Sequence, residues 1–216
     1  MASLPIKPEY EPTLGQLLAP RWHAASPAAR RATIALGAAL AIAAIALVLT
    51  LLNASYAHAG RVPFSFGYRG LYRVAPDPGG YVKVQQLGAT GRLEYSFAVD
   101  PLTLPSYTGE LAAELPIYAS SYIDALRRRV PGFALLGEGK TRVNTAPAYD
   151  VLYTTVQQGR ELYGRDVLLV PERPGAREGV DIVMLTAAGA SRQIEGPMEV
   201  ASTGVLLHPL RSFTLG

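Results

Sequence analysis

The sequence predicts an α+β protein, in which an antiparallel β-sheet packs against one long helix and a short C-terminal helix, preceded by a single transmembrane helix. Three observations lead to this prediction. Residues 32–52 form an uncharged apolar run. Residues 108–130 repeat apolar side chains at spacings of three or four, as one face of a helix does. Most of the remaining chain after residue 60 consists of short apolar or alternating runs bounded by Gly and Pro, which is typical of strands and turns.

The first element is a tail, residues 1–31, which contains five prolines and shows no sustained period. We therefore expect a disordered, Pro-rich tail. The alternative is a short segment at the membrane interface, because residues 14, 17 and 18 are leucines on one helical face and Trp22 follows them.

The apolar run of residues 32–52 is long enough to cross a bilayer. It contains ten Leu, Ile or Val, eight Ala and no charged residue. As a helix it would reach about 31 Å, which matches the hydrocarbon thickness of a membrane. The sequence thus predicts that residues 32–52 contact the lipid bilayer as a transmembrane helix, whereas a buried core helix would usually retain a polar stripe.

The charges that flank this run predict its orientation. Arg30 and Arg31 precede it, whereas the following segment, residues 53–61, carries no Lys or Arg before Arg61. The positive-inside rule then places the N-terminus in the cytoplasm and residues 62–216, the predicted α+β domain, outside the cell membrane. We expect residues 53–61 to be a juxtamembrane linker. The small residues at positions 57 and 59 leave an alternative open, secretion after cleavage that follows Ala59.

Strands and one long helix are expected in the outer domain. Residues 62–66 and 71–74 are predicted as a first strand pair. Further strands are predicted on each side of the helix. Pro101 and Pro105 close the section before the helix, and after the helix the second and third strands are joined by a tight turn at 158–160. The predicted strands are residues 81–86, 93–99, 133–137, 148–157, 161–170 and 180–186.

The long helix is predicted over residues 108–130. Thr108 is the expected N-cap, Pro116 lies inside the helix, and Pro131 and Gly132 end it. Its apolar face is expected to lie on the sheet and to include Leu111, Leu115, Tyr122 and Leu126. A short final helix is predicted over residues 200–207.

Several short motifs in residues 139–186 resemble the PsbP-like and LpqN-like group of extracytoplasmic domains. They are an Ala-Tyr pair opening a strand at 147–149, the turn at 158–160, a strand ending in Val-Pro at 170–171, and a Gly-led strand at 179–185, with Ser-Phe at 212–213 near the end. This resemblance implies an antiparallel sheet covered by helices, and an accessory or binding role outside the cytoplasmic membrane.

The same resemblance suggests a source and an anchor. A composition rich in Ala and Arg and poor in Lys is similar to that of actinobacterial proteins, whose LpqN-like members are usually lipoproteins. The chain has no cysteine, so the apolar run replaces the lipid anchor. A runner-up is the group of membrane-tethered cystatin-like domains associated with lipid-transport operons, which usually place the long helix before the first strands.

The sequence offers little for catalysis, and we expect no enzymatic activity, cofactor or metal. Residues 134–141 end like a phosphate-binding loop, but Ala134 stands where the motif needs Gly. Beyond residue 57 the histidines are His58 and His208, with no metal-binding spacing and no cysteine. No Gly-x-Ser-x-Gly elbow surrounds any serine. From residue 60 onward 16 basic residues face 15 acidic ones, so nucleic acid is not an expected partner.

Two sets of residues remain as candidate sites. Arg127, Arg128 and Arg129 form the densest charge cluster and are a candidate interaction surface, whereas the simpler explanation is a solvated helix end that satisfies the helix dipole. The second set could line a ligand cleft between helix and sheet, since Tyr combines an apolar body with a polar tip. It consists of Tyr118, Tyr122, Tyr149 and Tyr153.

Taken together, these features predict a single-pass membrane protein that presents a non-enzymatic accessory or interaction domain, with an envelope protein or a lipid as partner. The alternative is a carrier that binds an apolar small molecule or lipid between sheet and helix. A filled interface would favour the first function, and an apolar cavity of several hundred Å³ would favour the second.

Overall fold

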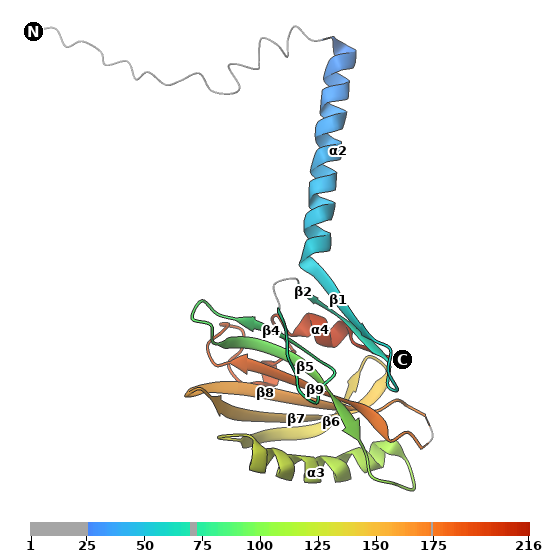
Figure 1. Cartoon of the computed structure of the whole chain (residues 1–216), viewed down its shortest axis with the longest axis vertical. Helices are drawn as coiled ribbons and strands as arrows, with labels where there is room; N and C mark the ends of the chain where they lie inside the picture. The colour runs from blue at the N-terminus through green and yellow to red at the C-terminus, as the bar shows by residue number, and fades with distance from the viewer. Residues whose placement is uncertain (1–25, 70–72, 174) are drawn as a thin grey trace, which may run out of the picture. The chain divides into compact units, whose positions relative to one another are not determined.

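The structure is a computed structural model that describes residues 26–69, 73–173 and 175–216. The predictions for the tail before Ser26 lie outside these residues. The chain divides into two units that meet at residues 50 and 51, an N-terminal one that contains most of helix α2 and a C-terminal domain. Each is described separately, with the element labels of Figure 1.

Helix α2, Pro27–Leu52, begins five residues before the predicted span and includes Arg30 and Arg31. The Ser26 hydroxyl accepts a hydrogen bond from the Ala29 amide at 3.2 Å, and Pro27 opens the first turn, so the start is a well-formed N-cap. The helical segment of residues 27–49 is long and apolar enough to cross a membrane. In its most apolar stretch of 18 residues, no residue is buried. The large aliphatic residues of this helix whose burial is described, from Ile34 to Leu49, expose between 52% and 68% of their surface.

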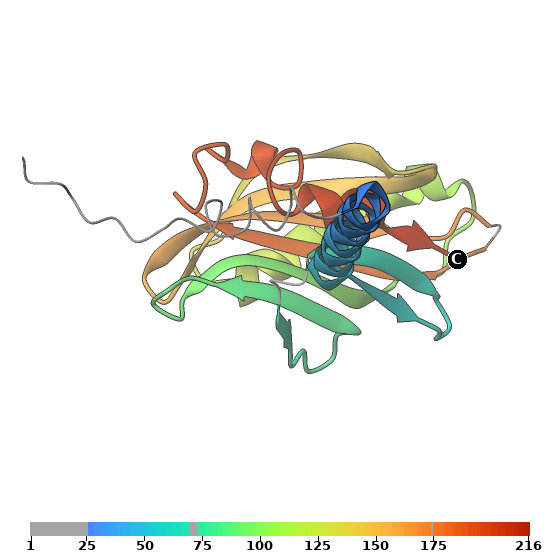
Figure 2. The same ribbon diagram turned by 90° about the horizontal axis from the view of Figure 1, so that it is seen from above.

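The domain is an antiparallel α+β structure, as the sequence predicts. Its large sheet has seven strands in the order β3-β4-β5-β9-β8-β7-β6. Their bounds are β3 Arg73–Ala75, β4 Val82–Leu87, β5 Leu93–Thr103, β6 Ala134–Val143, β7 Ala146–Gln157, β8 Arg160–Leu169 and β9 Glu178–Ala187. The views in Figures 1 and 2 show how the twisted sheet forms the middle of the domain.

A small sheet of three strands, in the order β1-β2-β10, covers one face of the large sheet. The strands are β1 Asn53–His58, β2 Phe64–Arg69 and β10 Thr214–Leu215, and the short helices η1 Pro197–Glu199 and α4 Leu207–Ser212 lie in the C-terminal segment. The rings of Phe66 and Phe97 are 4.8 Å apart and join β2 to β5. This first core is rich in aromatic residues, including Phe64 and Phe213.

Helix α3, Leu111–Arg129, covers the opposite face of the large sheet, as Figure 1 shows. Leu115, Tyr122 and Leu126 are buried against the strands, and Leu111 packs at the edge of this second core. The predicted apolar face of the helix is therefore confirmed. Its N-cap is Glu110, without a side-chain cap, so the prediction of Thr108 as the cap is wrong.

The tight turn at 158–160 is confirmed. Gln157 pairs with Arg160, and the two residues between them have positive φ angles of 52° and 72°. Two positive φ angles define a type I′ turn, which fits the twist of the flanking strands and suits Gly159.

Four local predictions are corrected by the structure. The predicted pair 62–66 and 71–74 does not form, because β2 pairs with β1 and β10 whereas β3 pairs with β4. The expected linker contains strand β1, whose alternate residues Tyr56 and His58 contact Phe64. The strand predicted over residues 133–137 is longer than expected, because strand β6 runs from Ala134 to Val143. The last helix is α4, later than the predicted 200–207, and η1 precedes that segment.

Candidate functional site

The most unusual feature of the domain is a group of aspartates on the sheet face that α3 covers. Asp100, Asp166 and Asp181 come from β5, β8 and β9, which are neighbours in the sheet. Asp100 pairs directly with Asp181, while Asp166 pairs with Val183, two residues further along β9. Side chains two residues apart in a strand share a face, so the three carboxyl groups converge. Asp166 and Asp181 are 0% and 3% exposed.

Two tyrosine hydroxyls meet the buried pair. The Tyr122 oxygen lies 2.6 Å from Asp166 Oδ2 and also makes a short hydrogen bond with Asp181 Oδ2. Tyr153 donates to Asp166 Oδ1 at 2.9 Å. Tyr153 fits there because Gly164 lies directly opposite on β8, where a Cβ atom would come within 2.4 Å of the tyrosine ring.

The number of protons in this chain of contacts determines a charge state. Tyr122 carries one hydroxyl proton and can donate to only one of its two carboxyl neighbours. The other contact therefore needs a protonated carboxyl that donates to the tyrosine oxygen. Asp166 accepts a second hydrogen bond from Tyr153 at its other oxygen, which favours its ionised form, so we assign a neutral Asp181 that donates to Tyr122, which donates in turn to an ionised Asp166.

The electrostatics agree with this assignment. Burial raises the pKa of Asp181 well above its ordinary value, and the neighbouring Asp166 raises it further. Burial also raises the pKa of Asp166 to about 6, although the hydrogen bonds from Tyr122 and Tyr153 oppose that rise. Burial, together with the two acids, holds the pKa values of Tyr122 and Tyr153 well above normal, so both phenols keep their protons.

A second acidic contact lies at Asp100. A Cβ atom on Gly80 would lie 2.1 Å from Asp77 Oδ2 and 2.5 Å from Asp100 Oδ1, so both oxygens crowd the same backbone position. Burial, together with the charge and hydrogen bonding of Asp77, raises the pKa of Asp100 to about 6. The two carboxyl groups thus favour sharing a proton.

Two cavities lie between α3 and the strands beside these acids. One, of about 350 Å³, is lined by residues that include Asp100, Asp181, Tyr118 and Tyr122. The other, of about 320 Å³, has Asp166 and Tyr153 in its wall. Both also share Asp100 and Arg129. The walls are therefore polar and charged rather than uniformly apolar.

The arginines predicted as one interaction surface have different surroundings. Arg127 pairs with Asp124 at 2.6 Å on the exposed side of α3. Arg128 is exposed. The guanidinium carbon of Arg129 lies 5.7 Å from the centre of the Tyr122 ring, and its charge lowers the pKa values of Asp100, Asp166 and Asp181. A joint role for the three as an interaction surface stays a prediction.

The four tyrosines predicted to line a cleft are also divided. Tyr118 and Tyr122 line the larger of the two cavities, with ring centres 6.3 Å apart, and Tyr153 lines the smaller one. Tyr149 lies further along β7, where its hydroxyl group is 3.3 Å from Glu138 Oε2. Ligand binding by these residues stays a prediction.

Sequence reasoning did not identify the aspartates. A signal was present, because each stands within an apolar strand segment, where an unpaired acid is rarely buried. Among the described residues, no group of three or more His, Cys, Asp or Glu side chains is arranged to hold a metal ion. Chemically, the arrangement can accept hydrogen bonds, hold a positive charge and exchange a proton.

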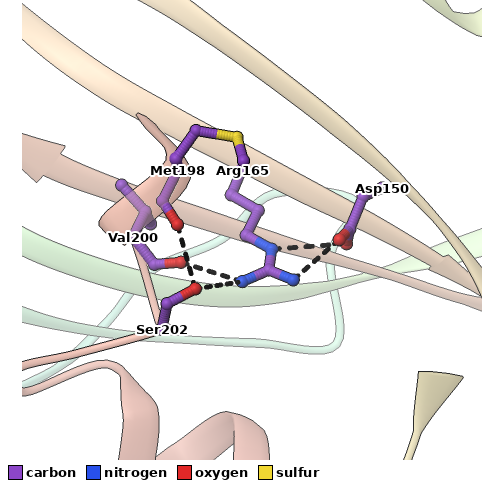
Figure 3. Close-up of polar contacts among 5 residues, drawn as sticks. All are labelled: Asp150, Arg165, Met198, Val200 and Ser202. Carbon is purple, nitrogen blue, oxygen red and sulfur yellow. Dashed lines mark hydrogen bonds and ion pairs between the residues drawn. The ribbon is translucent and has the colours of Figure 1, made fainter. Parts of the chain in front are cut away.

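The opposite face of the same sheet contains an ion pair of a conventional kind. Arg165 contacts Asp150 at 2.7 Å, and the two side chains are 13% and 15% exposed. Figure 3 shows the guanidinium between this carboxylate and the segment after η1, where it donates to the Val200 carbonyl at 3.0 Å and to Ser202 at 3.3 Å. Ser202 in turn donates to the Met198 carbonyl. This network fixes the C-terminal segment to the sheet.

Comparisons with known proteins show which solved structures have a similar fold. No protein-family model matches the sequence, and no curated protein is similar to it. Among solved structures, LpqN of Mycobacterium tuberculosis superposes with a TM-score of 0.51 at 12% identity, over 76% of this chain and 91% of LpqN. The cyanobacterial PsbP of Synechocystis gives a TM-score of 0.47 at 16% identity, over 77% of this chain and 94% of its own. The LpqN-like fold predicted from the sequence motifs is confirmed.

Proposed function

We propose that the protein is a membrane-anchored accessory domain of the cell envelope, because an LpqN-like domain follows a single apolar helix. The observation that carries the proposal is helix α2, whose large aliphatic residues from Ile34 to Leu49 are more than half exposed. Apolar surface of this extent is stable in a lipid bilayer and costly in water. LpqN itself is involved in cell envelope biogenesis.

The charge distribution supports an outward-facing domain. Arg30 and Arg31 lie in the first turns of α2, and the tail before them adds Lys7 and Arg21. On the other side the first basic residue is Arg61. Positively charged flanks stay in the cytoplasm, so the domain from residue 53 onward is assigned to the outer side.

Strand β1 argues for a retained anchor rather than a secreted product. Cleavage after Ala59 would remove the whole strand, Asn53–His58, from the small sheet. Tyr56 contacts the rings of Phe64 and Phe66 at 6.0 and 5.8 Å, so the first core would lose part of its aromatic packing. The edge of β2 would also lose its partner along six residue pairs.

An interaction role fits the space between α3 and the sheet better than a carrier of apolar molecules. Leu115, Ile123 and Leu126 are buried there among side chains of the sheet. The two cavities beside them are lined by Asp100, Asp166, Asp181 and Arg129. An apolar ligand would leave these groups desolvated without partners, which is unfavourable.

Extraction and topology experiments test the proposal. After washing with alkaline carbonate, the full-length chain should remain in the membrane pellet. A reporter active only outside the cytoplasm, fused at Gly216, should give signal, and a variant with Arg30 and Arg31 replaced by Glu should lose much of it. Recovery of a soluble product that starts at Gly60 would contradict the anchor, and a silent reporter on the unmodified chain would contradict the orientation.

A further inference from the structure

The larger cavity beside α3 contains a buried acceptor that has no partner. Asp181 lines this cavity and is 3% exposed, and its Oδ2 atom bonds to Tyr122. Its other oxygen, Oδ1, makes no hydrogen bond to any described residue. Buried polar atoms normally have partners, so this orphaned oxygen, on a side chain that lines the cavity, is an acceptor that a hydrogen-bond donor of a ligand would satisfy.

The surroundings of that oxygen select a positively charged donor. Asp100, directly opposite Asp181 in the sheet, lines the same cavity, and Asp166 lies on the next strand. The basic residue among those that line the cavity is Arg129, so the acidic groups outnumber the basic ones at this site. An additional cation would be attracted by this excess of carboxyl groups.

The aromatic wall favours the same chemistry. Tyr118 and Tyr122 line the cavity with their rings 6.3 Å apart. Arg129 already places a guanidinium 5.7 Å from the centre of the Tyr122 ring, a cation–π distance. A volume of about 350 Å³ suits a small organic cation or a single long side chain.

We propose that this cavity, between α3 and strands β5 and β9, binds an ammonium or guanidinium group through Asp181 and Asp100, with Tyr118 and Tyr122 as its aromatic wall. The cation comes either from a free small amine or from a lysine or arginine side chain of a partner. This assignment does not depend on the membrane topology of the protein.

Binding is coupled to release of a proton. In the free protein Asp181 is neutral and donates to Tyr122. When a cation R–NH₃⁺ enters, Asp181 gives its proton to solvent and becomes the carboxylate that the ammonium contacts, while the ammonium keeps its own protons. The Tyr122 proton can then serve either carboxylate. The groups that face Asp181 are Tyr118, Tyr122 and Arg129 of α3, Tyr153 of β7, Asp166 of β8 and Asp100 of β5, the last with Asp77 beside it.

Calorimetric titration of the full-length protein in detergent tests the proposal. The probes are n-butylammonium chloride and, as a neutral analogue of the same shape, n-butanol. Nα-acetyl-lysine methylamide serves as a model of a protein side chain. Titrations in two buffers of different ionisation enthalpy measure the protons released.

We expect saturable binding of butylammonium with net release of protons, tighter binding as the pH rises, and no binding of butanol. Asp181→Asn should weaken binding by about tenfold or more and abolish proton release. Asp124→Asn, on the exposed side of the same helix, should bind as the unmodified protein does. Stronger binding of the lysine derivative would assign the cation to a partner protein, and stronger binding of the free amine would assign it to a small molecule.

Equal binding by the Asp181→Asn variant, or equal binding of butanol, would overturn the assignment, as would the absence of saturable binding. If Asp181→Asn does not fold, Tyr118→Ala decides the question instead. Tyr118 is only half buried, so its loss should leave the fold intact and weaken the binding of butylammonium. Unchanged affinity in that variant would count against the proposal.

Discussion

Aspartates on the two faces of the seven-stranded sheet have different partners. On the face toward the small sheet, Asp150 receives a guanidinium from Arg165, and the pair is tied to the backbone of the C-terminal segment. On the face toward α3, Asp166 and Asp181 are buried more deeply and meet tyrosine hydroxyls and each other. A carboxylate with an arginine can stay charged, whereas a pair of buried acids must keep a proton between them.

The comparison indicates different roles for the two faces. On the face toward the small sheet, each of the three guanidinium nitrogens of Arg165 donates a hydrogen bond to an acceptor within the domain. The face under α3 keeps an unpartnered carboxyl oxygen and two cavities. The first arrangement stabilises the fold, whereas the second is available to a ligand.

The largest expected effect tests whether α3 covers the acidic face of the sheet. Leu126→Ala should lower the free energy of unfolding by about 2 to 5 kcal/mol, because it removes a buried side chain and leaves a cavity. Ile117→Ala is the matched control on the same helix, since Ile117 is 67% exposed, and should change stability by under about 0.5 kcal/mol. Urea unfolding of the full-length chain in detergent, followed by the near-ultraviolet circular dichroism of its tyrosines, measures both. Equal effects would contradict the assignment of the helix face.

Protonation of the buried acids provides the second test. The pKa of Asp166 rises from 3.8 to about 6 in the folded state, so its contribution to stability is present below pH 3.8 and is lost as the pH rises through about 6. A rise of that size corresponds to about 3 kcal/mol. Between pH 4 and pH 7 the unmodified protein should therefore lose stability relative to Asp166→Asn. Asp100 titrates near the same pH and its charge raises the pKa of Asp166, so the difference between the two proteins reports both coupled acids.

That difference is measured by urea unfolding at several pH values under constant ionic strength. Asp150→Asn serves as the comparison on the opposite face, where the carboxylate has an arginine partner. If the unmodified protein instead gained stability relative to Asp166→Asn as the pH rose, the pKa of Asp166 would be lowered rather than raised in the folded state, and the conclusion that burial outweighs the hydrogen bonds from Tyr122 and Tyr153 would be wrong.

The third test breaks the ion pair on the other face. Arg165→Met should cost about 2 to 3 kcal/mol, because it leaves the Asp150 carboxylate and the Val200 carbonyl with fewer partners in a site that is mostly closed to water. The double variant with Asp150→Asn should recover part of that loss, since no unpaired charge remains. A double variant no more stable than Arg165→Met would show that the pair acts through packing and not through charge.

The sequence predicts those parts of the fold that depend on local periodicity. The turn at Gln158 and Gly159 follows from residues that tolerate positive φ, and the buried face of α3 follows from helical spacing. Strand β1 lies in the segment predicted to be a linker. Local periodicity could not reveal it, because the strand forms by pairing with β2, which also pairs with β10 at the chain end. The Ser65 and Thr214 hydroxyl groups, 2.7 Å apart, join segments 149 residues apart in the sequence.

The aspartates were missed for a related reason. An acid in an apolar strand is visible in the sequence, but its neighbours depend on strand order. Asp100 meets Asp181 because β9 inserts beside β5, although 80 residues of sequence separate the two positions. Tyr122 was predicted on the buried face of the helix, whereas its hydrogen-bond partners could be found only with the sheet in place.

The smallest effects are expected at the end of helix α3, where Arg128 and Arg129 have different surroundings. Arg128→Ala should change the free energy of unfolding by under about 0.5 kcal/mol, because the side chain is exposed on the solvent side of α3. Arg129 lies over the Tyr122 ring and lowers the pKa values of the three aspartates, so Arg129→Ala should move the pH-dependent loss of stability to higher pH. The same unfolding series at several pH values measures both variants. A pH profile shifted by Arg128→Ala as much as by Arg129→Ala would mean that the cluster acts through its total charge, and that the acidic face responds to the whole helix end instead of to one guanidinium at the cavity.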